Sequence, residues 1–163
     1  MKIQESKETY LKILNESLIK KINILNCVYV LTEQQNLCFQ NEKEVAEVFE
    51  RCMDAKENLL KEMKMLDDGF DNVYANLKAY LKINASMHRI EVAKLQSSIK
   101  EITTLSIKIQ NLEYSTKQKF QEYLSARKNE IRQFNISNRS VSNYYKQMTG
   151  SLQGESFFID KQK

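Results

Sequence analysis

Apolar side chains repeat at helical spacing through the middle of the chain. From Leu59 onward the steps between them alternate four and three residues, which is typical of a helix that buries one seam against other helices. The seam consists of Cys52, Leu59, Met63, Leu66, Phe70, Val73, Leu77 and Tyr80. Counted back from Met63, it passes through Lys56, whose stem we expect to follow the apolar stripe while its ammonium reaches water. A polar residue at such a position can also fix the register of helix packing.

The opposite face of the same segment is polar. We expect Asp67 and Asp68 to lie in solvent on this face. Gly69 destabilises a helix by about 1 kcal/mol relative to alanine. It therefore marks either the close approach of another backbone or a weak point in the helix.

A similar pattern predicts a first helix from about Ser6 to about Cys38. Its apolar face consists of Leu11, Leu14, Leu18, Ile22, Leu25 and Tyr29. Asn41 and Glu44 have the spacing of a capping box, in which each side chain bonds a backbone N–H of the other residue. We therefore predict that the second helix runs from about Glu42 to Lys82.

A third helix is predicted to begin near Asn84 or Ser86 and to continue for about fifty residues. Its apolar positions are Met87, Ile90, Leu95, Ile99, Ile102, Leu105, Ile109, Leu112, Thr116, Phe120, Tyr123, Ile131 and Phe134. At 1.5 Å per residue this helix would be about 75 Å long. We expect it to extend past a compact bundle or to pair with a second copy of the chain.

The composition changes after Phe134, where asparagine and serine become frequent and two glycines follow. Residues 139–163 nevertheless retain apolar and aromatic side chains. We predict that a partner binds to Val141, Tyr144, Tyr145, Met148, Phe157, Phe158 and Ile159. The alternative is that this tail folds back on its own bundle. The expected architecture is all-α: an elongated antiparallel bundle of about three long helices with coiled-coil-like packing (residues 1–138), followed by a flexible C-terminal tail (residues 139–163).

The composition favours long helices in a cytoplasmic protein. The 163 residues include no proline and three glycines, which are the residues that interrupt helices. The longest apolar run, residues 27–31, is far shorter than the roughly 20 residues of a membrane span, and no signal peptide is visible. We therefore expect no membrane insertion. Cys27, Cys38 and Cys52 lack metal-ligand spacing, so we interpret them as buried free thiols in a reducing compartment.

Few residues suggest catalysis. His88 is the one histidine, and a helical phosphotransfer domain would use an exposed histidine to accept phosphate. However, Arg89, Ile90 and Glu91 follow it instead of a lysine and a small residue, so we interpret His88 as an ordinary surface or boundary histidine. Three scattered glycines cannot form a phosphate loop. We predict that the chain is not an enzyme and binds neither a metal nor a cofactor.

The charge is mildly basic, with a net charge of +4 and a pI near 8.8. The residues from Lys117 onward include nine basic and four acidic side chains, a net charge of +5. Nucleic-acid binding would require a denser basic face, so we expect no nucleic-acid partner. A basic tail can instead steer the approach of an acidic protein.

Several segments carry a resemblance to a known family. The run KENLLKEMKMLDDGFDNVY, from Lys56 to Tyr74, looks like the central segment of FlgN-type flagellar export chaperones of Gram-positive bacteria. Leu95-Gln96, residues 107–110 and Leu112-Glu113 are similar to their third helix. Residues 144–146 and 157–163 are similar to their closing tail, in which Gln162 departs from a more basic run.

The resemblance implies a cytosolic chaperone that holds hook–filament junction (hook-associated) proteins before their export. It would keep the apolar helices of these proteins apart and deliver them to the export apparatus. The alternative function is a structural coiled-coil spacer or tether that self-associates, and a homodimer is compatible with both.

Overall fold

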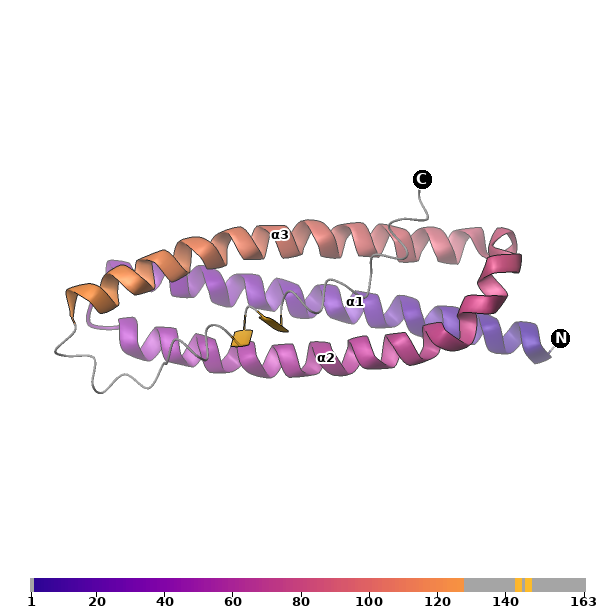
Figure 1. Ribbon diagram of the computed structural model, residues 1–163, viewed down its shortest axis with the longest axis horizontal. Helices are drawn as coiled ribbons and strands as arrows, with labels where there is room; N and C mark the ends of the chain where they lie inside the picture. Colours follow the sequence, from indigo (N-terminus) through magenta and orange to yellow (C-terminus); the bar gives the residue numbers. More distant parts are fainter. Residues whose placement is uncertain (1, 128–142, 145, 148–163) are drawn as a thin grey trace.

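The chain forms long helices that lie side by side (Figure 1). The computed structural model describes residues 2–127, 143, 144, 146 and 147. The helices are α1 (Lys2–Leu37), α2 (Val45–Asn84) and α3 (Arg89–Ala126), and the short 3₁₀ turns η1 (Cys38–Gln40) and η2 (Ala85–His88) lie between them. The described residues contain no strand, so the predicted all-α class is confirmed.

The helices have nearly the same length. They contain 36, 40 and 38 residues, which corresponds to about 54–60 Å each. The expectation that the third helix continues to Phe134 is wrong, because α3 ends at Ala126 and the backbone N–H of Arg127 turns back to the carbonyl of Leu124. With helices matched in length, α3 does not outrun α1 and α2. The predicted boundary at residues 138 and 139 lies outside the described residues.

The connection between α1 and α2 differs from the prediction. Glu44 is the N-cap residue of α2, and it makes no side-chain cap hydrogen bond. Asn41 instead follows η1, and its backbone carbonyl accepts the N–H of Glu44 at 3.0 Å. The predicted capping box is therefore wrong: the chain turns through backbone hydrogen bonds before α2 begins.

Each helix buries a row of residues at alternating steps of three and four, the spacing of coiled-coil seams. In α1 the row is Leu11, Leu14, Leu18, Lys21, Leu25, Val28, Thr32 and Gln35. In α2 it includes Phe49, Met53, Lys56, Leu60, Met63, Phe70, Leu77 and Leu81. In α3 it is Leu95, Ile99, Ile102, Ser106, Ile109, Glu113, Thr116 and Phe120.

The predicted apolar seams were correct over much of their length but shifted at their ends. In α2, Leu60 and Leu81 are buried, whereas their predicted neighbours Leu59 and Tyr80 lie at the edge of the core. Near η2, Met87 is 61% exposed and Ile90 is 70% exposed, so their predicted place in the core is wrong. The turn at η2 changes the helical phase between α2 and α3, which sequence spacing alone does not reveal.

The expectations for Asp67 and Cys27 also fail, and one of the two alternatives for Gly69 is excluded. Asp67 is half-buried and accepts a hydrogen bond at 2.9 Å from Nζ of Lys21, a buried lysine of α1. Burial raises the pKa of Asp67, and Lys21 opposes that shift only in part. No other backbone approaches Gly69, because a Cβ placed there would meet nothing within 4 Å. Cys27 is exposed, whereas Cys38 and Cys52 are buried as expected.

Helix α1 is the common neighbour of the other two. The backbones of α2 and α3 both run along α1, and they approach each other much less closely. Side chains close the space between them at one end, where the rings of Phe49 and Phe120 stack with centroids 4.3 Å apart. This arrangement brings residues of all three helices together beside that aromatic pair.

A candidate partner-binding site

Four polar side chains form a layer across the interior, which we call the polar layer: Thr32, Gln35, Lys56 and Glu113. Lys56 of α2 has no exposed surface, and its ammonium forms a salt bridge with the Glu113 carboxylate of α3. The same ammonium donates to Oε1 of Gln35 at 2.6 Å. Thr32 of α1 donates to Oε1 of Glu113 at 3.1 Å. The expectation that the Lys56 ammonium reaches water is therefore wrong, because these partners from α1 and α3 hold it inside.

Gln35 connects the polar layer to the backbone. Its Nε2 donates to the carbonyl of Phe49 at 3.0 Å, and its Oε1 faces Lys56. One side chain of α1 therefore bonds a backbone group and a side chain of α2. Such paired requirements fix the axial position of α1 against α2, since a shift along the helix would leave buried polar groups without partners.

Tyr144 covers the polar layer from outside the three long helices. Its side chain is 1% exposed and belongs to the main apolar cluster of the core. The Nζ of Lys56 lies 4.5 Å from the centroid of the Tyr144 ring, within the range of a cation–π interaction. Figure 1 shows the short segment that contains Tyr144 in yellow, next to α2. We refer to the polar layer together with Tyr144 as the Lys56 site.

Burial is the main influence on the pKa of the Lys56 ammonium. Desolvation lowers the pKa of the Lys56 ammonium, and the attraction of Glu113 offsets only part of that effect. A buried ion pair adds little net stability compared with apolar residues of similar volume, but loss of one partner destabilises a protein by about 3–5 kcal/mol. The pair therefore contributes to the specificity of the packing more than to its strength.

The structure describes one of the seven predicted partner-binding residues. Tyr144 is turned into the bundle, as in the fold-back alternative, while the neighbouring Asn143, Lys146 and Gln147 are exposed. The other six lie outside the described residues: Val141, Tyr145, Met148, Phe157, Phe158 and Ile159.

None of the four residues of the polar layer was predicted as a site residue. Lys56 was placed on the buried seam of its helix, whereas Thr32, Gln35 and Glu113 were not assigned to any seam. The signal that identifies them is their phase. Thr32 and Gln35 continue the three–four row of Leu25 and Val28, and Glu113 continues the row of Ile109. A polar residue on the buried row of each helix, at matching depth, is the pattern that reveals such a layer.

The histidine considered for phosphotransfer lies inside the corner between α2 and α3. His88 is 3% exposed, so its interpretation as a surface or boundary residue is wrong. Its Nε2 lies 2.8 Å from the hydroxyl of Tyr80 in a hydrogen bond. A phosphate acceptor must be accessible, and this burial removes the feature on which the phosphotransfer interpretation depends.

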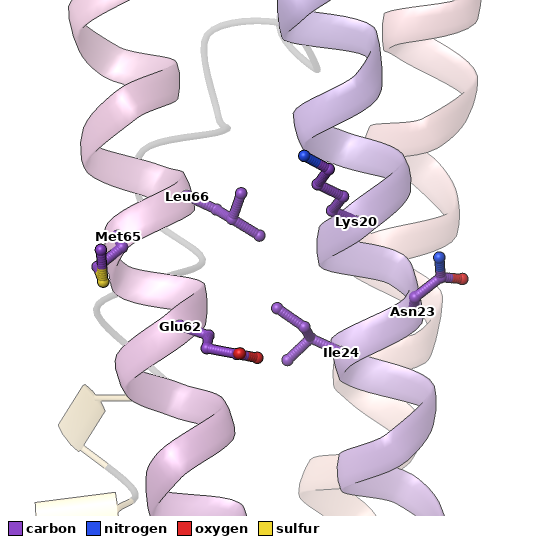
Figure 2. Close-up of a pocket in the computed structure, with 6 residues that line it drawn as sticks. All are labelled: Lys20, Asn23, Ile24, Glu62, Met65 and Leu66. Carbon is purple, nitrogen blue, oxygen red and sulfur yellow. The ribbon is translucent and has the colours of Figure 1, made fainter.

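A second, shallow site lies between α1 and α2. Figure 2 shows Leu66 and Ile24 directed toward each other across the space between the two helices, with Glu62 beside Ile24 and Lys20 above. Met65, also part of the lining, points away from this space and is 75% exposed. The site has a small apolar floor and two side chains of opposite charge, Lys20 and Glu62.

Neither site has the composition of a metal centre. Within residues 2–127, 143, 144, 146 and 147, no three side chains of histidine, cysteine, aspartate or glutamate lie close enough together to hold a metal ion. None of the described helices combines the length and apolar character needed to cross a membrane.

The fold and the Lys56 site define a helical bundle with an enclosed polar layer under an aromatic side chain. Comparisons of the chain with models of protein families, with curated proteins and with solved structures found no match.

Proposed function

We propose that this chain is a binding protein that holds an amphipathic helix of a partner against α2 and α3 at the Lys56 site. The observation that carries the proposal is the position of Tyr144. Fifteen residues separate Arg127 from Asn143, and the aromatic side chain that follows is almost fully buried against the long helices. A helix that presents an aromatic anchor in the same way would make the same contacts.

The proposed partners are flagellar hook–filament junction proteins, which the chain would hold in the cytoplasm and deliver to the export apparatus. Support for this identity comes from the FlgN-like segments around Lys56 and Glu113. Residues 56–74 and Leu112-Glu113 include two members of the polar layer. Recognition through a few buried anchors suits such partners, because a few anchors usually dominate the affinity of an interface. A micromolar complex requires about −8 kcal/mol.

A titration of the purified full chain with a purified hook–filament junction protein tests this function. We expect a 1:1 complex of micromolar or higher affinity. The double variant Lys56→Met/Glu113→Leu replaces the ion pair by apolar residues of similar size, and we expect it to bind at least ten-fold more weakly while it keeps its helical circular dichroism. The matched control Lys61→Met changes an exposed lysine of α2 and should bind like the unmodified chain.

Two results would contradict the proposal. The first is a chain that binds no junction protein and sediments as a tight dimer, which would favour the self-associating spacer. The second is a double variant that binds as tightly as the unmodified chain, which would exclude the Lys56 site as the contact surface.

A further inference from the structure

We propose that Tyr144 is an internal competitor for the partner's aromatic anchor. In this view the free chain closes the Lys56 site with its own tyrosine, and a partner helix binds when its aromatic side chain takes the place of the Tyr144 ring. The inference rests on the proposed function and adds to it the chemistry that is recognised: an amphipathic helix with one aromatic side chain placed over a buried ammonium.

The first argument comes from the surroundings of the Lys56 ammonium. Gln35 of α1 and Glu113 of α3 provide its two oxygen partners, both on long helices. The Tyr144 ring covers the ammonium at 4.5 Å and belongs to a separate segment. Oxygens on two rigid helices therefore fix the cation, while the aromatic face is the contact that can be exchanged without unfolding a long helix.

The second argument comes from how the Tyr144 segment is held. Among its four described residues, Tyr144 is buried and Asn143, Lys146 and Gln147 are exposed. Among these described residues the buried contact is therefore made by one aromatic ring, and another segment that carries an equivalent ring can replace that contact.

The third argument concerns why the closed state would dominate in the free chain. Tyr144 is covalently tied to α3, so its docking is intramolecular and has an effective concentration that a separate segment lacks. An untethered segment that made only these contacts would therefore compete poorly, so a partner helix must add contacts along α2 and α3 to displace the Tyr144 ring. Removal of the Tyr144 ring should therefore increase the affinity for a competing helix.

A peptide of the chain's own sequence tests the exchange without any partner protein. The probe is a fluorescein-labelled synthetic peptide of residues 139–150, titrated into full-length chains. We expect the Tyr144→Ala chain to bind the peptide at least ten-fold more tightly than the unmodified chain. The matched control Tyr114→Ala removes a tyrosine of α3 that is 64% exposed, and it should bind the peptide like the unmodified chain.

Two further titrations identify the contact. A peptide in which alanine replaces the residue corresponding to Tyr144 should bind neither chain. Adding Lys56→Met/Glu113→Leu to the Tyr144→Ala chain should remove the gain in affinity. Equal peptide affinity for the unmodified and Tyr144→Ala chains, or equal binding of the alanine peptide, would overturn the proposal.

A spectroscopic variant covers the case in which Tyr144→Ala fails to fold. The chain contains no tryptophan, so Tyr144→Trp introduces a single reporter at the Lys56 site. We expect its emission to shift to longer wavelength when the peptide of residues 139–150 is added in excess, because the tethered ring is released to water. An emission maximum unchanged at saturating peptide would show that residue 144 belongs permanently to the core and would overturn the proposal.

The peptide experiments and the partner titration can fail separately. If the chain binds a junction protein but the peptide gives no difference between variants, the proposed function stands and the competition by Tyr144 is wrong. If the peptide results are as expected but no junction protein binds, the exchangeable site is real and its proposed occupant is wrong.

Discussion

The two ends of the bundle interior are built on different physical principles. Toward the η2 end, the buried rows are mainly aliphatic and include Leu11, Leu14, Leu77, Leu81, Leu95 and Ile99. Toward the η1 end, the same rows carry Thr32, Gln35, Lys56 and Glu113, which bond one another across three helices.

This difference separates stability from specificity. Leucine and isoleucine contribute through the apolar area they bury, and that contribution depends little on which leucine faces which. The polar layer is satisfied in a single alignment, because each group needs its own partner. We conclude that the aliphatic end provides most of the stability, while the polar layer sets the register and supplies the surface that Tyr144 covers.

The largest expected effect comes from breaking the ion pair on one side. Glu113→Leu leaves the Lys56 ammonium buried without its carboxylate, and we expect the free energy of unfolding to fall by about 3–5 kcal/mol. The double variant Lys56→Met/Glu113→Leu should recover most of that loss. Urea unfolding of both variants measures the difference in the free energy of unfolding. Equal losses in the single and double variants would show that the uncompensated Lys56 charge is not the cause of the destabilisation.

At the aliphatic end, shortening a buried side chain should lower stability, and no second substitution is expected to restore it. Leu77 has no exposed surface, so Leu77→Ala should lower the free energy of unfolding by about 2–5 kcal/mol through lost burial and the cavity left behind. Ile83, 83% exposed on the same helix, is the control, and Ile83→Ala should stay within about 0.5 kcal/mol. Similar losses for both variants would place Ile83 in an interface between copies of the chain.

The η1 end should also respond to alkaline pH through its cysteines. Burial raises the pKa of Cys38 from its usual 9.0 to about 11. Between these values the thiol of the unfolded chain ionises while the folded thiol keeps its proton, so the folded state binds more protons and stability falls as pH rises. Over this window we expect Cys38 to account for a loss of up to about 2 kcal/mol.

Urea unfolding at pH 8, 9.5 and 11 tests this loss. Burial also raises the pKa of Cys52, so Cys38→Ala should flatten the pH dependence in part. If the free energy of unfolding fell more steeply with pH in the Cys38→Ala chain than in the unmodified chain, the predicted effect of Cys38 would have the wrong sign.

The smallest effect is a gain in stability. Gly69 lies within α2, and a Cβ there meets nothing within 4 Å. Gly69→Ala should therefore raise the free energy of unfolding by up to about 1 kcal/mol through helix propensity. A thermal melt checks this, and a lower melting temperature would indicate a close approach to Gly69 in solution.

The sequence predicted the helical class and most of the aliphatic end because spacing alone carries that information. It did not predict the polar layer, since Lys56 was expected to reach water and Glu113 was overlooked beside Leu112. A single polar residue on a buried row can be accommodated if its end reaches water. Whether it belongs to a buried polar layer depends on which residues the other helices place at the same depth. The start of α2 and the burial of His88 were missed for a related reason: both depend on how the chain turns between helices.

The position of Tyr144 at the candidate site could not be predicted from the sequence either. Its aromatic character marked it as a binding residue, but sequence spacing could not decide between a partner's surface and its own bundle. The structure buries it over Lys56, a contact between residues 88 positions apart in the chain.

Hydrogen exchange of the full chain with and without a purified hook–filament junction protein tests the central claim most directly. We predict slower exchange of the backbone amides around Lys56 in α2 and Glu113 in α3, together with faster exchange around Tyr144 as its ring is displaced. Slower exchange confined to the η2 turn, where Met87 and Ile90 are exposed, or no change in α2 and α3 despite binding, would contradict the claim that the Lys56 site holds the partner.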